Sequence, residues 1–85
     1  MLAVDEKEAS LTKALENDLL SRFGPLVGQD DLRIVLGYPT MEAFRQAHAR
    51  RQLPIPVFGL PNRRGKFALA KDIAQWLVSC RSSAN

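Results

Sequence analysis

Apolar residues recur at every fourth position near the start of the chain: Leu11, Leu15, Leu19 and Phe23. The opposite side of this segment is mostly charged, so the pattern predicts an amphipathic helix over residues 5–23. Asp5 and Glu8 have the spacing of a capping box, in which each side chain satisfies a free amide at the helix start. Gly24 and Pro25 are residue types that commonly end a helix.

Two shorter helical patterns follow within residues 29–51. The first carries Asp30 and Asp31 in its first turn, where carboxylates favour the positive end of the helix dipole, and Gly37 is expected to end it. The second begins at Thr40, a good N-cap residue. The expected inward residues are Leu32, Val35 and Leu36 in the first helix and Met41, Phe44, Ala47 and His48 in the second. Two short helices joined by a turn of about three residues predict a helix-turn-helix, although any helical hairpin shares this pattern.

The next region predicts a β-hairpin over residues 56–69. Two short apolar-rich runs, Val57–Leu60 and Lys66–Leu69, flank the turn sequence PNRRG. Proline, asparagine and glycine suit such a turn, which would place Arg63 and Arg64 at the tip. A basic hairpin after a pair of short helices is typical of the wing of a winged helix.

Helical spacing returns near the end of the chain and predicts a helix over residues 70–81. Its expected core-facing residues are Ile73, Trp76, Leu77 and, as a further candidate, Cys80. Residues 82–85 are expected to be a disordered tail. We therefore predict a single domain over residues 1–81, mainly α-helical with a small β-hairpin, of the winged helix-turn-helix class.

Charge is distributed unevenly along the chain. The net charge is only +3, yet no acidic residue lies between Ala43 and Lys71. The basic residues of this window are Arg45, Arg50, Arg51, Arg63, Arg64, Lys66 and Lys71. The first 22 residues instead contain more acidic than basic side chains. A local basic surface of this kind is typical of a protein that binds a polyanion.

The composition argues against several other classes of protein. The chain has one cysteine, Cys80, and one histidine, His48, so we expect no internal disulfide and no metal site. No nucleophile, base and orienting acid group together, and no phosphate-binding loop is present, so we expect neither an enzyme nor a cofactor. No apolar run approaches the roughly 20 residues that cross a bilayer, and the acidic start does not resemble a signal peptide. We expect a soluble cytoplasmic protein, most simply a bacterial one.

Residues 29–81 resemble the small winged-helix regulators of phages and plasmids. The resemblance rests on the helix start at Pro39 and Thr40, the aromatic Phe44, and the order LPIPVF, a basic turn, then LAKDIAQWL. The family includes AlpA-type activators, excisionases and the pyocin activator PrtN, and the layout also resembles plasmid repressors of the KorC type. The resemblance implies double-stranded DNA binding, with the second short helix in the major groove and the hairpin on the backbone or minor groove. Arg51 departs from the family, in which many members have a glycine that ends this helix.

The outward face of the second short helix and the hairpin tip are the predicted DNA contacts. Arginine can bond guanine twice in the major groove, and glutamine can do the same for adenine. The simpler alternative for an isolated helix is that its arginine and glutamine side chains form a solvated face. The arginines of the hairpin tip would then only keep the tip soluble. The absence of acidic residues between Ala43 and Lys71 favours DNA contact instead. The predicted DNA-binding residues are Thr40, Glu42, Arg45, Gln46, Ala49, Arg50, Arg51, Asn62, Arg63, Arg64 and Lys66.

We also expect a homodimer, because small regulators gain affinity when two recognition helices enter the groove about one turn apart. The predicted subunit contact uses apolar residues of the first and last helices: Leu11, Leu15, Leu19, Leu20 and Val78. Packing of the same stripe inside one chain is the alternative. Three functions fit the sequence: a transcriptional repressor with a palindromic operator, an excisionase-type recombination directionality factor, and an adaptor that binds another protein through its N-terminal helix.

Overall fold

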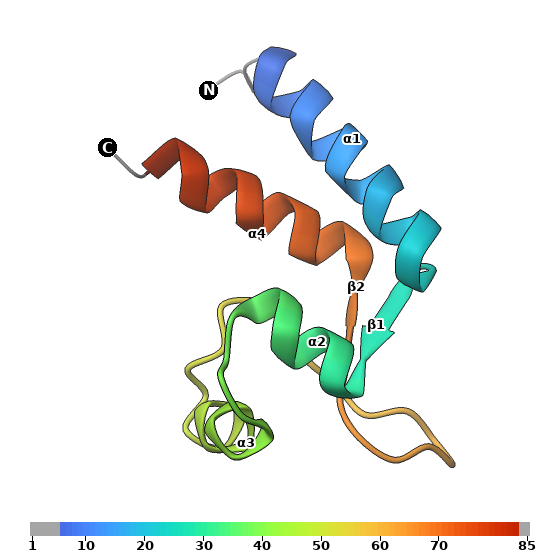
Figure 1. Ribbon diagram of the computed structural model, residues 1–85, viewed down its shortest axis with the longest axis vertical. Helices are drawn as coiled ribbons and strands as arrows, with labels where there is room; N and C mark the ends of the chain where they lie inside the picture. The colour runs from blue at the N-terminus through green and yellow to red at the C-terminus, as the bar shows by residue number, and fades with distance from the viewer. Residues whose placement is uncertain (1–5, 84–85) are drawn as a thin grey trace.

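The computed structural model describes residues 6–83, which form four helices and two short strands (Figure 1). In chain order these are α1 (Glu6–Phe23), β1 (Leu26–Gly28), α2 (Gln29–Leu36), α3 (Met41–Ala49), β2 (Phe67–Leu69) and α4 (Ala70–Ser83). The protein is therefore mainly helical with a small antiparallel sheet, as the sequence predicts. The predicted capping box involves Asp5, which lies outside the described residues.

The helices occupy two ends of the molecule, and the strands join them. Figure 1 shows α1 and α4 side by side at one end, with α2, α3 and the long loop that precedes β2 at the other. The apolar core runs through both ends and includes Leu19, Val27, Leu32, Leu36, Phe44, Ile55, Ala68, Ala70, Ile73 and Ala74. Five of the predicted inward positions of α2 and α3 belong to this core or pack against it: Leu32, Val35, Leu36, Met41 and Phe44. Ala47 is buried as well, whereas His48 is only half-buried.

The sheet pairs β1 with β2, and β1 is a strand that the sequence analysis missed. Val27 lies opposite Ala68, and both are fully buried on the inner face of the sheet. Because side chains alternate along a strand, the flanking pair of Leu26 and Leu69 faces outward, where Leu69 is exposed. Three residues are too few for a period-two pattern, and the partner strand lies about forty positions away, so local sequence carries little signal for this pairing.

The predicted hairpin strand Val57–Leu60 is reduced to a single bridging residue, so this prediction is wrong in its length. Only Phe58 pairs with β2: its N–H donates to the Phe67 carbonyl at 2.9 Å, and the Phe67 N–H donates to the Phe58 carbonyl at 2.8 Å. Pro56 would be the next residue on one side to exchange hydrogen bonds with β2, and it has no N–H to extend the ladder. The remainder of the predicted hairpin, residues 59–66, is a loop.

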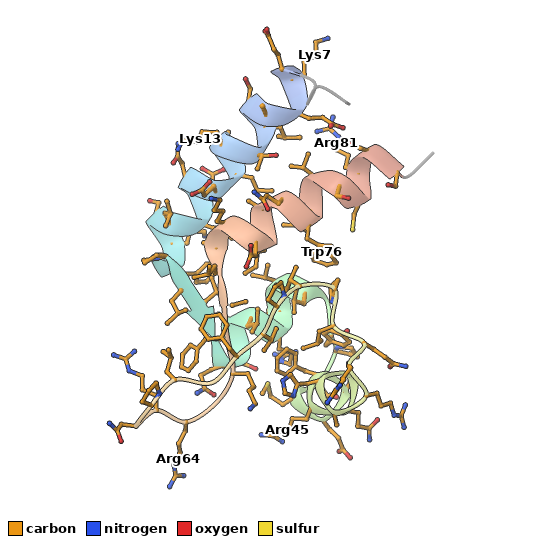
Figure 2. The ribbon with its side chains drawn as sticks, turned by 180° about the vertical axis from the view of Figure 1, so that it is seen from behind. Lys7, Lys13, Arg45, Arg64, Trp76 and Arg81 are labelled. Atoms are coloured by element: carbon orange, nitrogen blue, oxygen red, sulfur yellow. The ribbon has the colours of Figure 1, made fainter. Side chains whose placement is uncertain are left out.

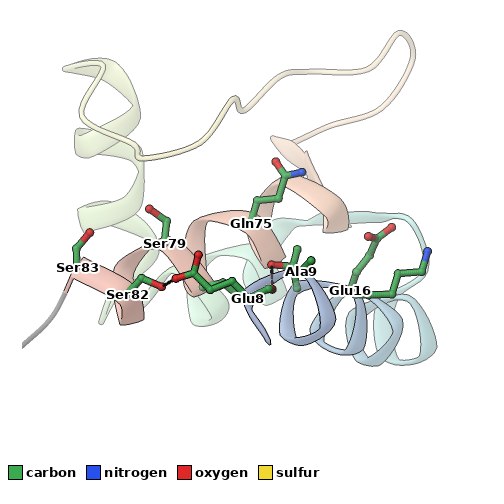
Figure 3. Close-up of a pocket in the computed structure, with 10 residues that line it drawn as sticks. Glu8, Ala9, Glu16, Gln75, Ser79, Ser82 and Ser83 are labelled. Carbon is green, nitrogen blue, oxygen red and sulfur yellow. Dashed lines mark hydrogen bonds between the residues drawn. The ribbon is translucent and has the colours of Figure 1, made fainter. Parts of the chain in front are cut away.

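The last helix is longer than predicted. α4 continues through Ser83, two residues beyond the predicted end, and the Ser82 hydroxyl donates a hydrogen bond to the Glu8 carboxylate of α1 (Figure 3). The start of α1 and the end of α4 are therefore joined, which accounts for order in part of the predicted tail. Cys80 is exposed and does not belong to the core.

Trp76 is half-buried on α4. The side chain, labelled in Figure 2, packs against the core. It lines a hollow together with Pro54, Ile55 and Pro56, residues of the segment that follows α3. The indole thus packs against the core, in agreement with its predicted role, and faces the hollow that it shares with the chain that leaves α3.

A groove of about 520 Å³ lies between α1 and α4 (Figure 3). Most of the residues that line it have polar side chains: Glu8, Thr12, Lys13, Glu16, Gln75, Ser79, Ser82 and Ser83. The apolar contact between the two helices occupies part of the surface that the sequence analysis assigned to a dimer. Leu19 and Val78 are each only 6% exposed, whereas Leu20 is 37% exposed. We therefore remove Leu19 and Val78 from the predicted subunit contact, because packing within the chain already covers them.

Candidate nucleic-acid interface

The inner face of α3 is anchored in the core, which leaves its polar face outside. Phe44 is 2% exposed, and its ring meets the edge of Tyr38 with centroids 5.9 Å apart and planes at 74°. Such edge-to-face geometry is favourable for aromatic pairs. His48 is half-buried, as expected for a packing residue. Thr40 caps the helix, because its Oγ1 accepts a hydrogen bond from the Ala43 N–H at 3.0 Å.

The turn between α2 and α3 is closed by a left-handed glycine. Gly37 has φ = 90°, its N–H donates to the Ile34 carbonyl at 3.0 Å, and the Tyr38 N–H donates to the Arg33 carbonyl at 3.1 Å. This is the Schellman arrangement, in which the last carbonyls of a helix find donors in the chain that follows. Gly37 therefore ends α2 where the sequence predicts, and a turn of four residues, 37–40, leads to α3.

The side chain of Arg33 stabilises the same turn, a role that the sequence did not predict. Its Nη1 donates to the carbonyls of Tyr38 at 3.0 Å and Pro39 at 3.1 Å, and its Nε donates to Asp30 Oδ1 at 2.7 Å. The hydrogen bond between the two side chains lowers the pKa of Asp30 and raises the pKa of Arg33. The direction in which α3 leaves α2 thus depends on one guanidinium that bridges helix and turn.

The C-terminal end of α3 is a second Schellman arrangement, built without glycine. The helix ends at Ala49, two residues before the predicted limit, and Arg51 follows with φ = 57°. The Gln52 N–H donates to the Ala47 carbonyl at 2.8 Å, and the Arg51 N–H donates to the His48 carbonyl at 3.0 Å. Arg51 therefore occupies a left-handed position of the kind that glycine usually fills at the end of a helix.

Replacement of Arg51 by glycine is expected to stabilise the fold. The left-handed conformation costs an ordinary residue about 1–2 kcal/mol, and glycine loses about 0.5–1 kcal/mol through its extra freedom when unfolded. We expect a net gain of about 0.5–1 kcal/mol in the free energy of unfolding, measured by urea denaturation. Arg50→Gly is the matched control: Arg50 has φ = −88°, so glycine there should destabilise the fold. A less stable Arg51→Gly variant would contradict this account.

The loop formed by residues 59–66 carries the second group of predicted contacts. Asn62 and Gly65 have φ values of 63° and 90°, so the loop turns sharply at both ends of its arginine pair. The side chains of Asn62, Arg63, Arg64 and Lys66 are all exposed. Asparagine tolerates the left-handed conformation better than most residues, which explains why this turn needs only one glycine.

Helix α3 and the loop present their basic side chains at the same end of the molecule. Figure 2 shows Arg45 and Arg64 pointing away from α1 and α4, with Lys7 and Arg81 at the opposite end. All the predicted DNA-binding residues of α3, its C-terminal end and the loop are exposed. Within residues 6–83, none of the arginines or lysines among them forms an ion pair. Their charges are therefore free to meet a ligand.

The acidic start of α1 does not neutralise this surface. The molecule measures 38 Å along its longest axis, and the first turn of α1, which holds Glu6 and Glu8, lies at the end opposite α3 (Figure 1). Salt screens exposed charges beyond about 8 Å at physiological ionic strength. The excess of exposed basic side chains on α3, its C-terminal end and the loop is thus local, even though the net charge of the chain is small.

None of the helices within residues 6–83 has both the length and the apolar character needed to cross a membrane. No protein-family model, curated protein or solved structure matches this chain in sequence or structure comparisons.

Proposed function

We propose that this protein is a sequence-specific regulator of transcription that binds double-stranded DNA through a winged helix-turn-helix. Helices α2 and α3 would form the helix-turn-helix, and residues 59–66 would form the wing. The observation that carries the proposal is the common direction of α3's polar face and the basic loop, both exposed and without ion pairs within residues 6–83. The function that fits best is a plasmid or phage repressor that binds a palindromic operator as a dimer.

The outer face of α3 has the chemistry of a major-groove reader. The groove is about 12 Å wide and admits an α-helix. Arg45, Gln46 and Arg50 project long side chains that can each form paired hydrogen bonds with a base edge. The Thr40 hydroxyl uses its oxygen for the cap and keeps its proton free to donate to a phosphate, beside the positive end of the helix dipole.

The wing arginines should act through phosphates and groove electrostatics. Arg63→Ala combined with Arg64→Ala should weaken specific and non-specific binding by similar factors. The slope of log affinity against log salt concentration should also become shallower by about one to two units, because each neutralised phosphate releases close to one counterion. Fluorescence anisotropy with labelled duplexes over a range of salt concentrations measures both effects, and an unchanged slope would exclude phosphate contact by this loop.

A dimer would contact its partner through residues that the fold leaves accessible. Leu20 is the exposed member of the predicted set, and Leu11 and Leu15 are half-buried. We expect light scattering to give two protomers per operator and Leu20→Glu to lower the dimer fraction. Ile34→Glu is the control, since Ile34 is 57% exposed on α2. One protomer per operator, or contacts at a single non-palindromic site, would overturn the dimer.

Binding to duplex DNA at low salt is the first test of the proposal. A footprint on selected DNA then distinguishes a repressor from an excisionase-type factor. A repressor should protect one inverted repeat that overlaps a promoter, with half-sites about 34 Å apart. An excisionase-type factor should cover several repeated sites and bend them. No binding to duplex DNA at low salt would reject both and favour the protein adaptor.

A further inference from the structure

We infer that Gln29 is a positioning residue that sets the basic loop relative to α3. Gln29 is the first residue of α2, the helix that the turn at residues 37–40 joins to α3. Its bonds to the loop therefore connect the two predicted DNA-contacting segments through one short helix. The consequence for DNA affinity rests on the proposed function, whereas the effect on the loop itself does not.

Gln29 contacts the loop with both its backbone and its side chain. Its N–H donates to the Lys66 carbonyl at 3.2 Å, and its side-chain Nε2 donates to the Arg64 carbonyl. Gln29 adopts φ = 56°, in the left-handed region that costs an ordinary residue energy. The backbone at this position is therefore held in a conformation that glutamine would not choose alone, and in that conformation both donors reach the loop.

Gly65 leaves the space that the Gln29 amide occupies. A Cβ atom at Gly65 would overlap the Nε2, Cδ and Oε1 atoms of Gln29, and Gly65 also has φ = 90°. A similar fit lies at the base of the loop, where a Cβ atom at Gly28 would overlap the ring of Phe67. The two glycines thus permit close contact between the start of α2 and both ends of the chain segment Arg64–Phe67.

The arrangement is specific for the length and chemistry of glutamine. Asparagine is shorter by one methylene group, so its amide would not reach the Arg64 carbonyl, yet it tolerates the left-handed backbone well. Gln29 is exposed, so loss of its bonds should affect the global stability little. The cost should instead fall on the loop, which would have to become ordered when Arg63 and Arg64 meet DNA.

The experiment uses the variants Gln29→Ala and Gln29→Asn and measures two quantities: the motion of the loop in the free protein and the affinity for duplex DNA. In the free protein, ¹⁵N relaxation should show increased motion of the amides of residues 62–66 in both variants, with no change in the C-terminal half of α4. Affinity for duplex DNA should fall about three- to tenfold. In the background of Arg63→Ala with Arg64→Ala, the same changes should alter affinity by less than about twofold, because the side chains that Gln29 positions are gone.

Gln75→Ala is the matched control, since Gln75 is an exposed glutamine on α4, and it should change neither the loop nor the affinity. Unchanged loop relaxation in both Gln29 variants would overturn the inference whether or not the protein binds DNA. Equal losses of affinity with and without the two arginines would also overturn it, because Gln29 would then act elsewhere. If the wild-type protein does not bind duplex DNA, the proposed function fails, and the relaxation data alone decide whether Gln29 positions the loop.

Discussion

Replacement of Arg45, Gln46 or Arg50 by alanine is expected to cost about 1–3 kcal/mol of binding free energy at the specific DNA site in each case. Arg45 and Gln46 are exposed on the outer face of α3, and Arg50 is exposed at its C-terminal cap, so their loss should leave the fold unchanged. Each removes a group that can pair with one base edge, and the loss should therefore be concentrated on the specific site. Competition between a selected operator and scrambled duplexes, at one fixed salt concentration, measures the discrimination directly.

Arg81→Ala separates base contact from general charge. This substitution removes a guanidinium group at the opposite end of the molecule (Figure 2). It should weaken binding to operator and to scrambled DNA only slightly. Wild-type discrimination in all three α3 variants would show that another element reads the sequence. Equal losses on operator and scrambled DNA would instead assign these residues to the phosphate backbone.

Phe44→Ala is expected to destabilise the protein by about 3–5 kcal/mol, because it removes a large buried ring and leaves a cavity. Phe44 is among the largest fully buried side chains, and Tyr38 packs against its ring. Small domains often have only about 5–10 kcal/mol of total stability. The substitution should therefore unfold a large share of the molecules at moderate temperature and abolish DNA binding. Urea denaturation followed by circular dichroism measures the free energy of unfolding.

Phe23→Ala provides the comparison, since Phe23 is only partly buried at the end of α1. This substitution should lower the free energy of unfolding by less than Phe44→Ala does. A loss of less than about 1 kcal/mol for Phe44→Ala would mean that α3 is not anchored through this ring. DNA binding that persists while α3 is released from the core would contradict the role of α3 as the reader.

Local signals accounted for the helices and much of the core. Gly37 and Thr40 mark the two sides of the turn before α3 because each satisfies backbone groups within its own helix end. The position of Phe44 on the inner face follows from helical spacing alone. The exposed face of α3 is equally local, since a short helix with one apolar side leaves its polar side outside.

Features that depend on distant partners were not predictable in the same way. Strand β1 exists because its backbone meets β2, and Gln29 reaches a carbonyl 35 positions away in the sequence. The same limit applies to the bridge at Phe58, because its partner Phe67 lies nine positions further along the chain and Pro56 lacks the donor that would extend the pairing on one side. Arg33 was the exception, since its spacing from Asp30 is a local helical signal. That spacing alone did not indicate that Arg33 would also reach across to the turn.

The single tryptophan gives the protein an intrinsic optical probe of one junction. Trp76 is the chain's only indole, and it lines one hollow together with the segment that leaves α3. Because half-buried indoles emit at wavelengths that depend on their exposure to water, the emission maximum reports how closely α4 packs against that segment. Excitation of the indole would therefore follow a shift of the segment after α3 without any attached dye. Stopped-flow mixing with unlabelled DNA could then time that shift separately from the contacts made on the opposite face of α3.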